Sequence, residues 1–183
     1  MARGDGKNRE EKAEVRRVQP FEPDKILTAL ERHKVDFVVI GAYAAVLQGW
    51  VDPTRDIDIT PDRDHGNLVR LAEALLEIDA QVISEDGELD PGWPIDDQHL
   101  RILGTTSIST RHGDIDVVNN PSATEGYADL SRSSESFWLS IGESKIKVAQ
   151  LQRVVNSKRE ADRPKDRLAL PELERLLDEK DKS

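Results

Sequence analysis

Hydrophobic and polar positions follow regular periods along most of the chain after residue 20. A continuous apolar run at residues 37–40 predicts a short buried strand. Gly41 ends this run, and the small residues at 42–48 predict a short helix. Further on, apolar residues recur at helical spacing over residues 67–78. This spacing predicts an amphipathic helix whose inward positions are Leu68, Leu71, Leu75 and Ile78.

Apolar and acidic residues alternate in the segment between these two helices. Ile57 and Ile59 alternate with Asp56 and Asp58, which predicts a strand with one buried face and one polar face. The same alternation returns at residues 113–118. We therefore expect two strands of the same type, each with its carboxylates on one side.

Weaker patterns predict the remaining elements. They are a helix beginning near Asp24, strands at 80–84 and 102–110, a loop at 86–99, a hairpin around Gly142 formed by 137–141 and 145–148, and helices at 149–159 and 164–177, the second interrupted at Pro171. The fold class is α/β (α+β), with a mixed β-sheet flanked by helices and a C-terminal helical pair.

The chain divides into three predicted regions. Residues 1–20 have few apolar residues and charges of both signs, which predicts a disordered arm. Residues 21–148 form the predicted core, and residues 149–183 form a helical segment that packs on it.

Composition narrows the range of functions. The 183 residues carry a formal net charge of −10 at pH 7, which argues against a protein whose whole surface binds duplex DNA. The chain has no cysteine, so disulfides and thiolate zinc sites are excluded and a cytoplasmic protein is favoured. No apolar run approaches the roughly 20 residues needed to cross a bilayer, so we expect no membrane association.

The segment from Val39 to Ile59 carries the candidate chemistry. A glycine directly after a buried strand, here Gly41, lets the backbone approach a ligand, and the N-terminus of the following helix favours a phosphate. Asp56 and Asp58 point to the same side of their strand, where neighbouring carboxylates repel each other unless a cation holds both. Such oxygen ligands suit Mg²⁺ (or Mn²⁺) that bridges to substrate phosphates. An isolated pair of this kind also occurs on ordinary solvated strands.

A third carboxylate strengthens this interpretation. If the strand at residues 113–118 pairs beside the first, Asp116 or Asp114 joins the other two acids. Three convergent carboxylates commonly bind the metal ions of a two-metal phosphoryl-transfer site.

The order of these motifs resembles the nucleotidyltransferase superfamily that includes DNA polymerase β. The resemblance is carried by Gly41, by Pro53-Thr54-x-Asp56-Ile57-Asp58-Ile59, and by the later strand with an acid between apolar residues. More closely, the chain is similar to the minimal AbiEii/MenT-type nucleotidyltransferase toxin group, through the segment Leu151-x6-Lys158-Arg159-x3-Arg163-Pro164-Lys165-Asp166. The resemblance covers roughly residues 24–178.

The resemblance implies transfer of a nucleoside monophosphate from an NTP to an acceptor hydroxyl or phosphate. Asp56, Asp58 and Asp116 would hold the metal and act in catalysis, and Asp116 fits the family pattern better than Asp114. Lys158 would contact the triphosphate, with a surface lysine as the alternative. The residues expected to contact the nucleotide are Gly41, Ala42, Thr54 and Asp166. Asp166 has two further interpretations, as a helix cap or as a residue that orients Lys158.

The resemblance also implies partners. In the toxin group the acceptor is tRNA or a protein and a cognate antitoxin binds the enzyme, whereas in a second branch the acceptor is a small antibiotic molecule. A non-catalytic nucleotide-binding module is the third alternative, supported by Ala42, where the group often has Gly or Ser. Arg55 is expected to point away from the acids by strand alternation. Basic residues that could contact RNA, or form a solvated face, are Arg101, Arg111, Lys145, Lys147, Lys158, Arg159, Arg163 and Lys165.

Overall fold

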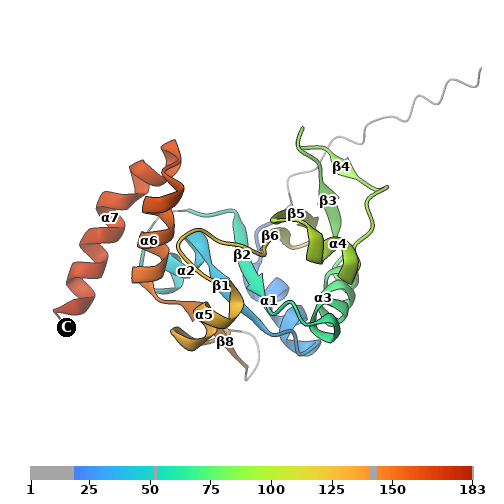
Figure 1. Cartoon of the computed structure of the whole chain (residues 1–183), viewed down its shortest axis with the longest axis horizontal. Helices are drawn as coiled ribbons and strands as arrows, with labels where there is room; N and C mark the ends of the chain where they lie inside the picture. The colour runs from blue at the N-terminus through green and yellow to red at the C-terminus, as the bar shows by residue number, and fades with distance from the viewer. Residues whose placement is uncertain (1–18, 52, 141–143, 183) are drawn as a thin grey trace, which may run out of the picture.

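The computed structural model describes residues 19–51, 53–140 and 144–182 (Figure 1). Its helices are α1 (Pro23–Arg32), α2 (Gly41–Leu47), α3 (His65–Glu77), α4 (Asp97–Ile102), α5 (Tyr127–Arg132), α6 (Leu151–Ala161) and α7 (Pro164–Asp181). Its strands are β1 (Phe37–Ile40), β2 (Asp56–Pro61), β3 (Gln81–Ile83), β4 (Leu89–Asp90), β5 (Thr105–Thr110), β6 (Gly113–Val118), β7 (Ser134–Trp138) and β8 (Lys145–Ala149). The predicted class, α/β (α+β), is confirmed.

The strands form one mixed sheet in the order β4-β3-β5-β6-β2-β1-β8-β7. The neighbours β2 and β6 are parallel, and β1 pairs antiparallel with β2 and parallel with β8. The other neighbouring pairs are antiparallel. A mixed sheet with a C-terminal helical pair is the architecture expected from the sequence.

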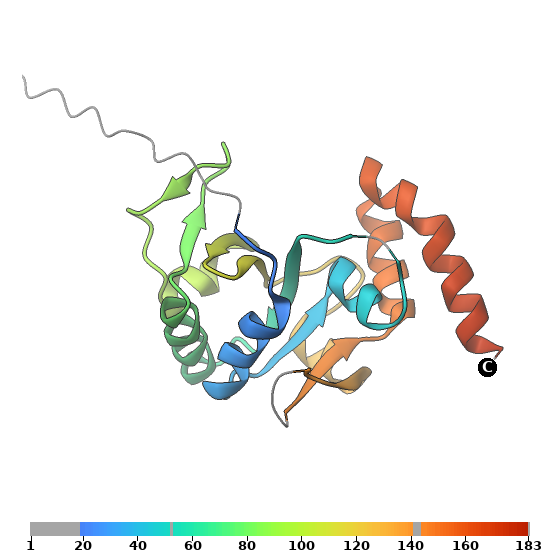
Figure 2. The same ribbon diagram turned by 180° about the vertical axis from the view of Figure 1, so that it is seen from behind.

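The two faces of the sheet are covered unequally. Ile57 and Ile59 of β2 lie in the main hydrophobic core, which also contains the buried residues of α1 and α3. On the opposite face, Val38 packs with Leu130 of α5 and Ala149 of β8 in a much smaller cluster. Figure 2 shows α1 in front of the sheet, and Figure 1 shows α5 in front of the other face. The acids of β2 alternate with its isoleucines, so they point to the sparsely covered face.

The helical pair α6–α7 lies at one end of the molecule (Figure 1). Val154 and Val155 of α6 and Leu173 of α7 belong to the main core, so this pair packs on the sheet domain. The expected interruption at Pro171 is wrong, because α7 continues through it. Pro171 has no N–H to donate to the carbonyl group of Arg167, four residues earlier in the helix. Both residues are exposed, so water can donate a hydrogen bond to that carbonyl group instead.

Other differences from the predictions are local. The segment expected as a loop at 86–99 contains β4 and the start of α4, which is capped by the side chain of Asp96. The strand expected from residue 102 begins only at Thr105, because Ile102 is the last residue of α4. The six-residue helix α5 was not predicted, because it is too short to show a period. The predicted arm at 1–20, apart from residues 19–20, and the turn around Gly142 lie outside the described residues.

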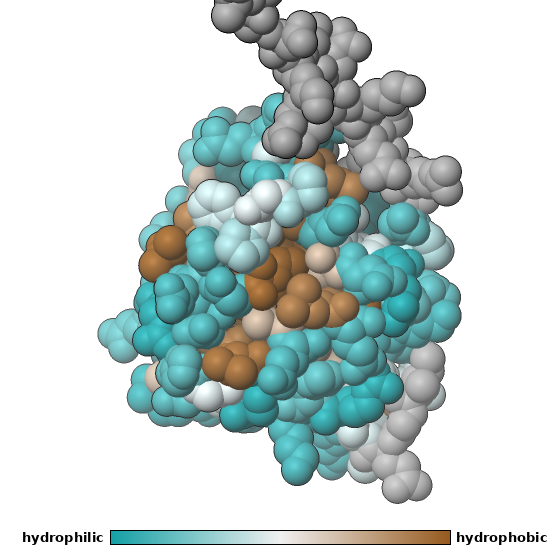
Figure 3. All heavy atoms as spheres, turned by 90° about the vertical axis from the view of Figure 1, so that its right-hand side faces the viewer, coloured by the Kyte–Doolittle hydropathy of each residue, from teal (hydrophilic) through white to brown (hydrophobic). Residues whose placement is uncertain are grey.

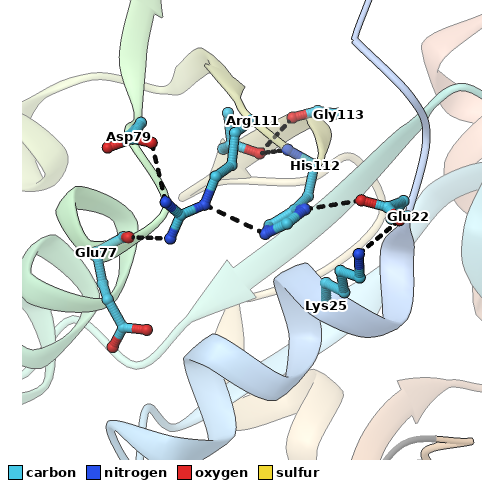
Figure 4. A network of polar contacts seen from close by, with 8 residues as sticks. Glu22, Lys25, Glu77, Asp79, Arg111, His112 and Gly113 are labelled. Carbon is cyan, nitrogen blue, oxygen red and sulfur yellow. Dashed lines mark hydrogen bonds and ion pairs between the residues drawn. The ribbon is translucent and has the colours of Figure 1, made fainter.

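A polar network ties the β5–β6 turn to α1 and α3 (Figure 4). The backbone N–H of Glu22 donates to the carbonyl of His112 at 2.8 Å, and the two side chains are 2.9 Å apart. Arg111 donates to the Asp79 carboxylate at 3.0 Å and to the Glu77 carbonyl at 2.6 Å. These contacts join the turn before β6 to the start of α1 and to the end of α3.

Apolar side chains gather on the surface at the end of the molecule that carries α3, α4 and the β3–β4 edge (Figure 3). The helices of this end contribute the exposed side chains of Leu76 and Ile102. Because α6 and α7 lie at the opposite end, this surface is separate from the site described below. Within the described ranges, no helix is long and apolar enough to cross a membrane.

Candidate active site

Two parallel strands bring the candidate carboxylates together. Their register pairs Asp58 with Asp116 and Asp56 with Asp114, across strands that lie about 4.8 Å apart. Asp56, Asp58 and Asp116 line one hollow of about 620 Å³, and Asp114 is not part of its lining. Of the two acids that the sequence left open, the structure therefore places Asp116 with the acids of β2.

The electrostatics of this hollow centre on Asp58. Burial, followed by the charges of Asp116 and Asp56, raises the pKa of Asp58 to about 7, although the charges of Lys165 and Lys158 act in the opposite direction. Burial also raises the pKa of Asp116, against a hydrogen bond from Ser107 that lowers it. At neutral pH Asp58 therefore binds a proton readily, and a cation would relieve the repulsion between the carboxylates.

A neighbouring residue in the sequence holds the side chain of Asp56 in place. The Thr54 hydroxyl donates to Asp56 Oδ1 at 2.8 Å, and both residues line the hollow. Arg55 is exposed and also contributes to the lining, and its expected orientation away from the acids stays a prediction. Because β2 begins only at Asp56, strand alternation does not by itself fix the direction of the Arg55 side chain.

Gly41 is fitted against the most perturbed carboxylate. It has a φ of +64°, and a Cβ added to it would lie 2.0 Å from Asp58 Oδ2. Both the backbone conformation and the space therefore require glycine. Gly41 and Ala42 line the hollow, and no side chain caps the start of α2. Their backbone N–H groups are thus the donors that this turn offers to a ligand.

The helical pair brings cations to the hollow, where Lys158, Arg163 and Lys165 are part of the lining. The fully buried Asp166 accepts hydrogen bonds from Lys158 Nζ at 3.0 Å and from Arg163 Nε at 2.6 Å. Burial alone would raise the pKa of Asp166, but the hydrogen bonds from Arg163 and Lys158, together with the charges of these two residues, outweigh it and lower the pKa.

Asp166 does not line the hollow, and its expected contact with the nucleotide stays a prediction. The expected cap is wrong as well, because α7 begins after Arg163 without a side-chain cap. The carboxylate instead contacts Lys158, as the third interpretation requires.

Sequence patterns did not single out one part of the wall. It consists of Asn120, Pro121, Ser122 and Thr124, which follow β6, and of Arg153 and Ser157 on α6. None of these residues belongs to a periodic or charged pattern. Only their position, directly after the strand that carries Asp116, is a signal that could have identified them.

The carboxylates suit a divalent cation in kind, but they do not form a finished metal cage. In the part of the chain that the structure describes, no group of three or more His, Cys, Asp or Glu side chains is arranged to hold a metal ion. Mg²⁺ bound with nucleotides commonly uses one or two carboxylates together with substrate phosphates. The pair Asp58–Asp116, with its raised pKa values, fits a cation of that kind.

Comparison with known proteins identifies the fold. No protein-family model and no curated protein sequence matches the chain. The lincosamide antibiotic adenylyltransferase LnuA, solved with lincomycin bound, aligns with a TM-score of 0.57 and 15% identity over 86% of this chain and 99% of its own. The antibiotic-resistance factor ANT(2'')-Ia aligns with a TM-score of 0.51 and 15% identity over 83% of this chain and 78% of its own.

Proposed function

We propose that this chain, which has the nucleotidyltransferase fold, transfers a nucleoside monophosphate from an NTP to an acceptor hydroxyl or phosphate. The observation that supports the proposal is a single hollow that joins three groups: the carboxylates of β2 and β6, the Gly41 turn, and the cations of α6 and α7. A triphosphate with its divalent cation requires such a combination, because the cation needs carboxylates and the phosphates need positive charge.

Each group has a role in the proposed reaction. The backbone N–H groups of Gly41 and Ala42 bind phosphate oxygens, and Lys158 stabilises the charge that develops on the leaving pyrophosphate. The acceptor oxygen forms a bond to the α-phosphorus while the bond to pyrophosphate breaks. Asp116 takes the proton of an acceptor hydroxyl during this step, a role that its raised pKa favours.

We propose that Asp56, Asp58 and Asp116 hold Mg²⁺ (or Mn²⁺) together with the phosphate oxygens. When bound, the ion polarises the phosphoryl group and favours ionisation of the attacking hydroxyl. The Thr54 hydroxyl keeps Asp56 in place for this purpose. Because nucleoside triphosphates are intracellular substrates, the proposal also places the protein in the cytoplasm.

The acceptor has two candidates. The AbiEii/MenT-type toxin assignment, with tRNA or protein as acceptor and a cognate antitoxin, rests on the order of sequence motifs. A small-molecule acceptor is favoured by the basic side chains, because several that were expected to contact RNA are held by carboxylates. These pairs are Arg111–Asp79, Arg159–Glu174, Lys158–Asp166 and Arg163–Asp166. LnuA is itself an adenylyltransferase of a small antibiotic.

Two measurements test the proposal. The melting temperature (Tm) is measured with each of the four NTPs, with and without Mg²⁺, and we expect at least one NTP to raise it in Mg²⁺. An NTP labelled at the α-phosphate is then incubated with total RNA, with protein, and with small hydroxyl compounds that include lincomycin. Asp58→Ala should abolish transfer, whereas Asp178→Ala, an exposed acid on α7, should not.

The outcomes separate the alternatives. No rise in Tm with any NTP, or unchanged transfer by Asp58→Ala, would refute nucleotidyl transfer at this site. A rise in Tm without transfer to any acceptor would favour the non-catalytic nucleotide-binding module, the interpretation supported by Ala42.

A further inference from the structure

A second hollow, of about 830 Å³, opens beside the active-site hollow. Five residues line both hollows, so the two share a wall: Asn120, Pro121, Ser122, Thr124 and Arg153. Its volume is in the range of sites that bind small molecules, and it is wider open to solvent than the active-site hollow. The shared loop follows β6 directly, so a molecule in the second hollow lies next to the strand that carries Asp116.

The second hollow differs from the first in charge. Its charged lining residues are Glu125, Asp129, Arg132, Arg153 and Glu160. Both arginines approach the same carboxylate: Arg153 Nη2 lies 2.8 Å, and Arg132 Nη2 3.8 Å, from Asp129 Oδ1. Glu125 and Glu160 are exposed and have no ion-pair partner among the described residues. Three carboxylates and two guanidinium groups give this lining a net charge of −1, and the carboxylates without an arginine partner are those of Glu125 and Glu160.

The ion pair of Arg153 separates the two electrostatic environments. The active-site hollow is lined by Lys158, Arg163 and Lys165, whereas on the shared wall the charge of Arg153 is balanced by Asp129, which is only 17% exposed. The positive surface that suits a triphosphate therefore ends at this wall. A second polyanion, such as an RNA backbone, would meet Glu125 and Glu160 beyond it.

We propose that the second hollow is the acceptor subsite and that it takes a small, hydroxyl-bearing molecule with a positive charge. The cationic group faces Glu125 and Glu160, and the amide and hydroxyl groups of Asn120, Ser122 and Thr124 line the wall between the acceptor and the nucleotide. This assignment rests on the proposed nucleotidyl transfer, because it names the second substrate of that reaction.

Three disaccharides of similar shape test the charge preference. They are the glucosamine disaccharide, which is cationic, cellobiose, which is neutral, and a glucuronic-acid disaccharide, which is anionic. Binding to the full-length protein is measured by saturation-transfer NMR, with Mg²⁺ and the α,β-methylene analogue of the NTP that raises the Tm most. We expect the cationic sugar to bind about fourfold more tightly than cellobiose, since each exposed ion pair contributes roughly a factor of two.

Two double variants localise the effect. Glu125→Gln/Glu160→Gln should remove the preference for the cationic sugar, so that it binds as weakly as cellobiose. Glu85→Gln/Glu88→Gln removes the same charge from exposed positions at the β3–β4 turn and should keep the full preference.

The possible failures are distinguishable. Equal binding of the three sugars, or an unchanged preference in Glu125→Gln/Glu160→Gln, overturns the acceptor subsite. Displacement of the cationic sugar by bulk tRNA overturns it in favour of a nucleic-acid acceptor. A Glu125→Gln/Glu160→Gln variant that also loses the nucleotide-induced rise in Tm would place these glutamates at the nucleotide instead. If no NTP raises the Tm of the wild type, the proposed nucleotidyl transfer is refuted. Binding of the three sugars is then compared without a nucleotide analogue, so the charge preference of the second hollow is still tested.

Discussion

Replacing Asp58 by Asn removes the most perturbed charge in the protein and keeps the shape of the side chain. In the folded protein, burial and the charges of Asp116 and Asp56 raise the pKa of Asp58 from 3.8 to about 7. An amide has no such cost of ionisation at any pH. We therefore expect Asp58→Asn to be more stable than the wild type at about pH 8 in the absence of divalent cations.

The sign and size of this effect follow from linkage. Because the folded-state pKa is raised, the stabilising effect of the protonated carboxyl group is fully present below pH 3.8 and is lost as the pH rises toward about 7. A shift of roughly three pKa units corresponds to about 4 kcal/mol, and partial exposure of the carboxylate reduces this to about 2 kcal/mol. For a chain of this length the variant should melt about 4–8 °C higher at about pH 8.

Calorimetry or circular dichroism between about pH 4 and pH 8, in buffer with EDTA, measures the effect. The two melting temperatures should converge near pH 4 and separate as the pH rises. In Mg²⁺ with an NTP the order should reverse, because only the wild type retains the carboxylate that we propose as a metal ligand.

The matched control is Asp178→Asn, which removes the same charge from an exposed position on α7 and should change the Tm little at any pH. A variant Asp58→Asn that folds normally but melts at or below the wild-type temperature at about pH 8 would refute the reasoning.

Two further substitutions test the framework of the site. Gly41→Ala places a Cβ 2.0 Å from Asp58 Oδ2 at a φ of +64°, so it should lower the Tm and abolish the nucleotide-induced rise. Gly104→Ala, where an added Cβ meets nothing within 4 Å, should do neither. The side chain of Gln48 donates hydrogen bonds to the carbonyl groups of Ala44 in α2 and Ala149 at the end of β8, and it accepts one from the N–H of Leu151, the first residue of α6. Gln48→Leu removes all three. Urea denaturation should show a loss of about 2–4 kcal/mol, against little change for the exposed Gln98→Leu.

The sequence predicted those parts of the site that depend on local periodicity. Alternation with Ile57 and Ile59 was enough to place Asp56 and Asp58 on one face of a strand, and the structure shows this arrangement. The partner of Asp58 depended on which strands pair, and this is a long-range property. Only the register of β6 against β2 decides that Asp116, and not Asp114, lies opposite Asp58.

Other features could not be read from sequence because they depend on burial. Asp166 looked like a helix cap, but it lies fully buried between Lys158 and Arg163, which is a consequence of how α6 and α7 pack. The loop after β6 shows no pattern of its own, and it becomes part of the site only because β6 ends beside the hollow. Pro171 predicted an interruption of α7, but its exposed position removes the main cost of the missing hydrogen bond.

The uneven cover of the sheet and the charge of the hollow have one physical cause. A helix packed over β2 and β6 on the acid-bearing face would bury Asp58 and Asp116 without partners, at a cost of several kcal/mol for each charge. Instead α5 packs at β1 and β8, and α6 brings Lys158 to the hollow. The cations of this end lower the pKa of Asp58 only in part, since it stays at about 7.

The positive and negative charges that line the hollow therefore do not cancel, and neither a triphosphate nor a divalent cation alone would neutralise them. A triphosphate without a cation would be repelled by Asp58 and Asp116, and a divalent cation without a triphosphate would be repelled by Lys158 and Lys165. Bound together, each offsets the charge that opposes the other, so each should raise the affinity of the other by the same factor. The comparison of NTPs with and without Mg²⁺ is thus the measurement in which this site should differ most from a surface that binds nucleotides through positive charge alone.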